Sequence, residues 1–190
     1  MSTTLPDEPV TLPLTVEHYA ALVEAGVFER STGQIELIRG RLVRMNPQGP
    51  QHADPIDVLN VWSVRTAAHA FTIRIEKPLN LPELHSCPEP DIAWVTSGRY
   101  NLRHPEAADV HLLIEVSNTS GRFDRGEKLQ LYAEAGIEDY WRFDIPSRHV
   151  EVYRHPQGDV YQSVETHGLG STISPLCLPA AKLSVAEVFG

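Results

Sequence analysis

The sequence predicts a mixed α/β domain, because helical and strand patterns alternate through its middle. Residues 52–69 and 124–135 are expected to form helices, and the first of these places its apolar residues at helical spacing. Phe71, Ile73 and Ile75 alternate with polar neighbours, which is typical of a strand. The predicted order is therefore α-β-β-β-α-β, with strands at 71–75, 91–95, 110–116 and 140–145.

The segments on either side of this core have simpler patterns. Residues 1–12 are polar with two prolines and are expected to form a loose leader. Thr15 is predicted to cap a first helix that ends near Arg30. A hairpin then pairs residues 35–38 with 42–45.

Beyond Pro146, residues 150–153 and 160–164 flank a Gln-Gly turn and are expected to form a second hairpin. Residues 183–189 are expected to form a short helix. The 190 residues are predicted to fold as one domain, because two halves would each lie near the lower size limit for a stable core.

The formal net charge is −9, from 16 basic and 25 acidic residues. This balance opposes non-specific attraction to a polyanion and argues against a nucleic-acid coat protein. Arg39, Arg41 and Arg44 could form a local basic patch, although a solvated hairpin surface explains them as well.

Cysteine usage and hydropathy bear on the compartment. Cys87 and Cys177 lie far apart, and the first ten residues have neither a basic start nor an apolar run, so a cytoplasmic protein is expected. No apolar stretch approaches the roughly 20 residues that cross a bilayer, so no membrane association is expected.

Two acids stand at the ends of predicted buried strands. Asp91 opens the run of residues 92–95, and Glu115 closes that of residues 110–116. A close pair of buried carboxylates needs a cation, a proton or hydrogen-bond donors to neutralise it. Lys128 follows in a predicted helix, and two carboxylates with one ammonium are the minimum set for Mg²⁺-assisted phosphodiester hydrolysis. Taken singly, each of the three has an ordinary alternative as a turn, ion-pair or surface residue.

Several segments resemble the Uma-type family of bacterial restriction endonucleases, described as a domain of unknown function, in the PD-(D/E)XK nuclease superfamily. The resemblance covers residues 13–145, which would be the nuclease-like core, with residues 146–190 as a C-terminal hairpin and short helix. The segments are IELIRGRLVRMNPQGPQH from Ile35, PEPDIAWV from Pro88, LLIEVSNTS from Leu112, DRGEKLQLYAEAGI from Asp124 and EDYWRFD from Glu138.

This resemblance implies a restriction-endonuclease-like core, in which a mixed sheet is flanked by helices and preceded by a helix and a hairpin. It also implies that Asp91 and Glu115 are catalytic metal ligands for Mg²⁺ or Mn²⁺. The superfamily usually places its lysine two residues after the second acid, where this chain has Ser117. The resemblance therefore implies that the catalytic lysine has moved to the next helix, as Lys128.

Two further residues are second-rank candidates. Glu36 could be a third acid at the metal, or it could be the solvent-facing residue of an alternating strand. His52 stands where this branch of the superfamily tends to carry a histidine. It could contact phosphate or orient a water, or it could be a surface residue at a helix start.

The leading hypothesis is a Mg²⁺- or Mn²⁺-dependent endonuclease with nucleic acid, DNA in the first place, as its partner. The rival is a catalytically silent interaction or regulatory module that keeps the nuclease fold, since a fold does not fix a function. A hydrolase of another phosphate ester is a third reading. The oligomeric state, with a homodimer among the options, is left open by the sequence.

Overall fold

The structure is a computed structural model that describes residues 11–47, 49–118 and 122–190. Residues 1–10 of the expected leader lie outside the described residues. The N-terminal elements are α1 (Val16–Glu24), β1 (Ile35–Ile38), β2 (Arg41–Arg44) and α2 (Pro50–Ala67). The remaining elements are β3 (Phe71–Ile75), β4 (Ile92–Thr96), β5 (Val110–Ser117), α3 (Arg122–Glu134), β6 (Asp139–Asp144), β7 (His149–Gln157), β8 (Val160–His167), β9 (Thr172–Ile173), β10 (Leu183–Ser184) and α4 (Val185–Phe189), with short 3₁₀ turns at Pro82–Leu84 and Ala107–Asp109.

A six-stranded sheet in the order β3-β4-β5-β6-β7-β8 forms the centre of the protein. Its neighbours are antiparallel except β5 and β6, which are parallel. A parallel connection needs a crossover, and α3 supplies it. The mixed α/β class and the α-β-β-β-α-β order, here α2-β3-β4-β5-α3-β6, are therefore confirmed.

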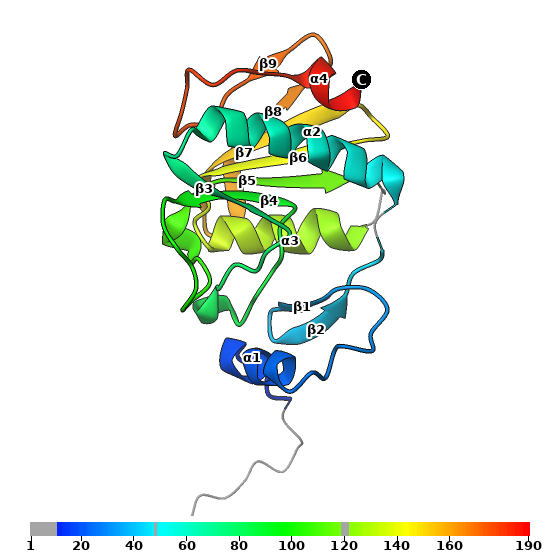
Figure 1. The fold of residues 1–190 in the computed structure, drawn as a ribbon, viewed down its shortest axis with the longest axis vertical. Coiled ribbons are helices and arrows are strands. Elements are labelled where there is room, and N and C mark those ends of the chain that lie inside the picture. The colour runs from blue at the N-terminus through cyan, green and yellow to red at the C-terminus, as the bar shows by residue number, and fades with distance from the viewer. Residues whose placement is uncertain (1–10, 48, 119–121) are drawn as a thin grey trace, which may run out of the picture.

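Helices cover both faces of this sheet, with α2 and α4 on one face and α3 on the other (Figure 1). The cluster beneath α2 and α4 includes Leu59, Trp94, Trp141 and Val188. The cluster beneath α3 includes Tyr132 and Tyr140, whose rings meet edge to face. Alternate residues of the central strands therefore serve two cores, which is why these strands are continuously apolar.

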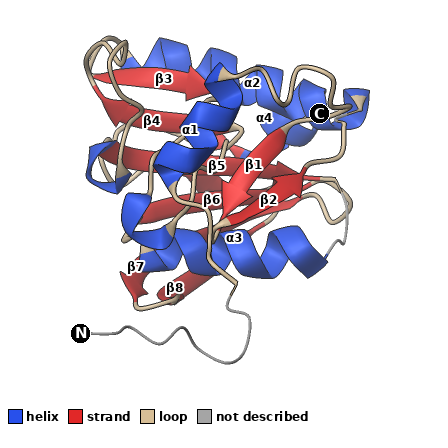
Figure 2. Ribbon diagram, turned by 90° about the horizontal axis from the view of Figure 1, so that it is seen from below, coloured by secondary structure: helices blue, strands red, loops and turns tan. Residues whose placement is uncertain are grey.

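The hairpin β1–β2 and the helix α1 form a separate layer beyond α3 (Figures 1 and 2). Thr15 caps α1 as predicted, since its Oγ1 accepts a hydrogen bond from the His18 backbone N–H at 3.3 Å. The helix ends at Glu24 and not near Arg30, because Gly26 adopts a positive φ of 70° and turns the chain.

Two other boundaries differ from the prediction for local reasons. The second helix ends at Ala67, because Ala68 and His69 both have positive φ values. The expected helix over 183–189 begins only at Val185, because Leu183 and Ser184 pair with β9. No helix in the described part of the chain is both long and apolar enough to cross a membrane.

A buried carboxylate fastens the C-terminal segment to the sheet. Asp139 at the start of β6 is 1% exposed, and it accepts hydrogen bonds from Arg154 Nε at 2.9 Å, Trp141 Nε1 at 2.9 Å and the Leu176 N–H at 2.7 Å. Burial raises the pKa of Asp139, and the bond from Arg154 opposes that rise.

We expect Arg154→Ala to lower the free energy of unfolding by about 3 kcal/mol at pH 8, because it leaves the Asp139 carboxylate buried without its cation. The loss should be smaller at pH 5. Without Arg154 the pKa of Asp139 in the folded state rises further above its unfolded value, so the folded protein gains a proton as the pH falls. Urea denaturation at both pH values measures the difference.

The matched control is Arg103→Ala, which removes a cation from the exposed pair with Asp109. Such exposed pairs contribute little to stability, so this variant should unfold nearly as the wild type does. An equal decrease in the free energy of unfolding for the two variants would contradict the proposal that Asp139, paired with Arg154, fastens the C-terminal segment to the sheet.

Candidate active site

Asp91 and Glu115 lie beside each other at one edge of the sheet. Strands β4 and β5 are antiparallel, and Ile92 pairs with Ile114. The residue before Ile92 and the residue after Ile114 therefore occupy neighbouring positions, and both carry carboxylates. The Val116 N–H donates to Asp91 Oδ2 at 2.6 Å, which fixes the aspartate against β5. Asp91 is 4% exposed, whereas Glu115 is half-buried.

Lys128 of α3 reaches this edge from the face that α3 covers. Its Nζ lies 3.3 Å from Glu115 Oε1 and 3.1 Å from each carboxylate oxygen of Glu36. The lysine is 8% exposed, and both acids that its ammonium contacts in the described residues are carboxylates of this cluster, Glu36 and Glu115. The structure therefore brings Asp91, Glu115 and Lys128 together as the sequence led us to expect.

Glu36 is buried at 1% exposure, so the solvent-facing alternative for it is wrong. It belongs to β1, outside the six-stranded sheet, and the hairpin that carries it is fastened to α3. Arg39 of the hairpin pairs with Glu134 at 2.6 Å, and Arg41 pairs with Glu127. These two arginines are therefore neutralised by α3 and do not form the free basic patch that was one reading of the sequence.

His52 stands in the first turns of α2, with Nε2 3.3 Å from Asp91 Oδ1. Its side chain is 15% exposed, so it is not a freely solvated surface residue. Burial lowers the pKa of His52, and the Glu115 charge opposes this. A neutral imidazole at this place can hold the orientation of Asp91 by a hydrogen bond.

Two neighbours of Glu115 add to the site. Tyr132 is fully buried and donates its hydroxyl to Glu115 Oε1 at 2.8 Å. Its spacing of i+4 from Lys128 was the signal for a shared face. Arg142 is the register partner of Glu115 on β6, is 8% exposed and donates to Glu151 through Nε at 2.9 Å.

The burial of several acids around one ammonium shifts their pKa values. Burial, with the Glu115 charge beside it, raises the pKa of Asp91 well above the usual range. Burial also raises the pKa of Glu36 to about 7, although Lys128 opposes the rise. Burial by itself would lower the pKa of Lys128, but Glu115, Glu36 and Asp91 together raise it, so the lysine stays protonated.

The donors at this edge are hard oxygens with an excess of negative charge. Within the described residues, no three His, Cys, Asp or Glu side chains are arranged to hold a metal ion together. Asp91 and Glu115 occupy neighbouring positions on β4 and β5, so they are the pair that could bind a divalent cation, with water filling the remaining positions.

We expect Asp91→Asn to be at least as stable as the wild type at pH 8 without metal, because the folded protein disfavours the charged form of Asp91. The raised pKa means that folding favours the protonated carboxyl, so wild-type stability falls as the pH rises above the unfolded pKa near 3.9. The advantage of the variant should therefore widen from pH 5 to pH 8 in urea denaturation.

Asp109→Asn is the control, because it should change the stability in the opposite direction. The hydrogen bond from Arg103 lowers the pKa of Asp109, so this substitution should remove stability that is present above the unfolded pKa. An Asp91→Asn curve that runs parallel to the wild type at every pH would show that Asp91 is not held in an unfavourable charged state.

Comparisons with known proteins agree with this fold. A solved structure described as "a putative nuclease belonging to DUF820", from Anabaena variabilis, superposes with a TM-score of 0.72. It shares 16% sequence identity, and the match covers 93% of this chain and 98% of that one, so the likeness is one of fold. No curated protein matches the chain.

A family model described as "Putative restriction endonuclease" matches residues 16–186, a span that includes every residue of the site. The resemblance noted in the sequence is thereby confirmed, and the chain belongs to the Uma2 family.

Proposed function

We propose that this protein is an endonuclease that hydrolyses phosphodiester bonds in DNA with Mg²⁺ or Mn²⁺ as its cofactor. The observation that carries the proposal is the set formed by buried Asp91, half-buried Glu115 and buried Lys128 at one edge of the sheet. Membership of a family described as restriction endonucleases supports nuclease activity and a nucleic-acid substrate.

Asp91 and Glu115 are the residues that would hold the metal ion. Their environment fits a divalent cation, because three carboxylates here face a single ammonium. When bound, the ion polarises the phosphoryl oxygen and lowers the pKa of a coordinated water. His52 and the Val116 N–H fix the two oxygens of Asp91, and the Tyr132 hydroxyl fixes Glu115.

Lys128 acts as a fixed positive charge in this mechanism. Its pKa is raised by the surrounding carboxylates, so it does not take a proton from water. Its ammonium instead stabilises negative charge that develops on the phosphate in the transition state. Glu36 contacts Lys128 and helps to hold its ammonium in place, while burial raises the pKa of Glu36 to about 7.

One observation favours the catalytically silent module as the second candidate. The chain carries a net charge of −9, and the hairpin arginines are paired with acids of α3. Both features weaken attraction to DNA. Incubation of the purified protein with plasmid and with single-stranded DNA in Mn²⁺ separates the two candidates, because a silent module cleaves neither.

We expect Mn²⁺ to raise the melting temperature of the wild type, since a ligand at 100 times its dissociation constant stabilises by about 2.7 kcal/mol. Asp91→Asn removes one of the two ligands and should lose most of this shift. Thermal melts with and without Mn²⁺, supported by calorimetric titration, measure both effects.

Glu165→Gln is the control for charge alone, because Glu165 is exposed on β8 and outside the site. It should keep the full Mn²⁺ shift. Equal Mn²⁺ affinity in Asp91→Asn and the wild type would refute the role of Asp91.

The test of Lys128 must allow for its burial, because Lys128→Ala alone would leave Glu36 buried without its cation and destabilise the fold. Glu36→Gln combined with Lys128→Met removes both charges at similar volume. We expect this double variant to cleave DNA about 10² to 10³ times more slowly than Glu36→Gln alone.

Circular dichroism and Mn²⁺ melts should match between the single and double variants, which separates loss of catalysis from loss of fold. Glu36→Gln with Lys128→Arg should remain slow, because a planar guanidinium does not reproduce a compact ammonium. Cleavage at the rate of the single variant would show that Lys128 is not the catalytic lysine.

A further inference from the structure

The charges of this protein are poorly suited to holding a DNA duplex by its phosphates. Non-specific duplex affinity comes mainly from Lys and Arg side chains that neutralise phosphates. Here five arginines are already paired with acids of the same chain: Arg39 with Glu134, Arg41 with Glu127, Arg103 with Asp109, Arg142 with Glu151 and Arg154 with Asp139. These five of the 13 arginines, together with the net charge of −9, weaken the attraction to phosphates, so contacts to the uncharged parts of a nucleic acid gain weight.

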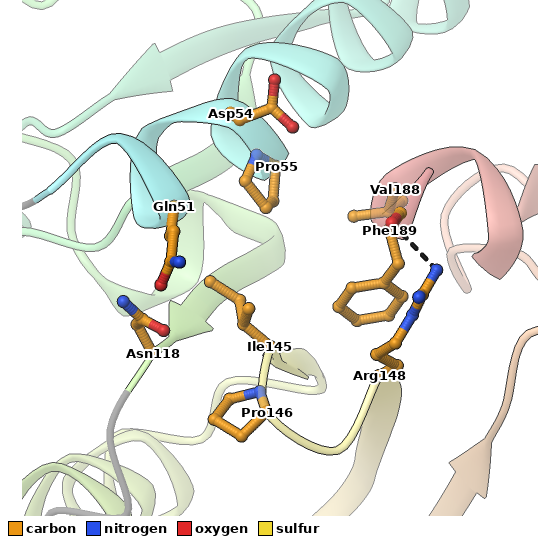
Figure 3. Close-up of a pocket in the computed structure, with 9 residues that line it drawn as sticks. All are labelled: Gln51, Asp54, Pro55, Asn118, Ile145, Pro146, Arg148, Val188 and Phe189. Atoms are coloured by element: carbon orange, nitrogen blue, oxygen red, sulfur yellow. Dashed lines mark hydrogen bonds between the residues drawn. The ribbon is translucent and has the colours of Figure 1, made fainter.

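A cavity of about 440 Å³ lies at the carboxyl ends of the parallel strands β5 and β6 (Figure 3). This is the edge of an open α/β sheet where ligands commonly bind. The first turns of α2, the end of β5, the segment after β6 and the helix α4 form its walls. The lining residues are Gln51, Asp54, Pro55, Asn118, Ile145, Pro146, Arg148, Val188 and Phe189.

The cavity is adjacent to the candidate active site. Gln51 directly precedes His52, whose Nε2 contacts Asp91. Asn118 follows Glu115 by three residues, which is at most about 10 Å along an extended chain. A strand whose phosphate lies at Asp91 and Glu115 can therefore place a nearby nucleotide in the cavity.

The lining suits a flat, uncharged ring with donors and acceptors on its edge. The amide side chains of Gln51 and Asn118 point toward each other from opposite walls, and the apolar surfaces of Ile145, Pro146 and Phe189 lie alongside (Figure 3). Each amide can both donate and accept hydrogen bonds.

The two charged residues of the lining have opposite signs, so the lining has no excess positive charge to select a phosphate. Arg148 Nη2 donates to the backbone carbonyls of Phe189 at 3.1 Å and Gly190 at 2.7 Å, which fixes it against α4. Asp54 carries a negative charge at the same cavity and repels anions.

We propose that this cavity binds an unpaired nucleobase close to the phosphodiester that is cleaved, so that the preferred substrate is a single strand and not a duplex. The inference rests on the proposed nuclease function. Enzymes that engage a base outside the stack contact its polar edge and cover its faces with apolar side chains. Base stacking and edge contacts supply the affinity that the paired arginines of this chain do not.

The test is an abasic scan of binding. Fluorescein-labelled 12-nucleotide single strands, each with one abasic position, are titrated with the protein in Ca²⁺ and followed by anisotropy. We expect the wild type to bind the intact strand at least tenfold more tightly than the matching duplex. One abasic position should weaken binding by about tenfold. Gln51→Ala/Asn118→Ala should lose the same affinity on the intact strand and show no further loss at that position.

Gln162→Ala is the matched control, because it removes an exposed amide on β8, outside the cavity. It should behave as the wild type. A flat abasic scan, or a duplex bound as tightly as the single strand, would overturn the inference. Cleavage of the same oligonucleotides in Mn²⁺ is measured in parallel. Cleavage with a flat scan refutes the base pocket alone, whereas an abasic effect without cleavage refutes the nuclease proposal alone.

Discussion

The contact of the Lys128 ammonium with Glu36 and Glu115 joins three parts of the protein that the backbone keeps apart. Glu36 comes from a two-stranded hairpin, Glu115 from the central sheet and Lys128 from the crossover helix. The ammonium makes burial of two carboxylates tolerable, and the carboxylates in turn keep the buried lysine charged. Removal of the lysine charge would leave two carboxylates without their cation, so the hairpin, the sheet and α3 depend on one another at this point.

The same cluster shows a conflict between stability and chemistry. A neutral core of equal volume would hold these elements together at lower electrostatic cost. The protein instead keeps Asp91 beside Glu115, although that proximity and burial push the aspartate toward its protonated form. Hydrogen bonds reduce the free-energy cost of burying these carboxylates but do not remove it. The Tyr132 hydroxyl, the His52 imidazole and the Val116 N–H each contact one carboxylate oxygen. An arrangement of this kind is typical of a site that is organised for a ligand.

Contacts between residues that are close along the chain, or that lie on neighbouring strands, could be predicted from the sequence. Asp91 and Glu115 flank consecutive apolar strands, so their proximity followed once the strands were paired as neighbours. The burial of Glu36 could not be predicted, because the alternation of residues in a four-residue strand does not show which face of the strand packs against the rest of the protein. Its cover comes from Lys128, 92 positions later. Arg39 and Arg41 were read as solvated or as a basic patch for the same reason, since their acidic partners belong to a distant helix.

The separate hairpin has a consequence for how the site is assembled in time. Lys128 and Glu115 are 13 positions apart, so they can meet as soon as β5 and its crossover form. Glu36 adds a contact across 92 positions. Its hairpin meets the rest of the fold through the isolated Leu37–Cys87 bridge and side-chain pairs to α3, and not through the ladder of the six-stranded sheet. Detachment of the hairpin is therefore a sub-global opening, which leaves the main sheet intact while it exposes the lysine to solvent. Hydrogen exchange of the amides in β1 and β2 would then measure how often Glu36 leaves Lys128, separately from the free energy of unfolding of the whole molecule.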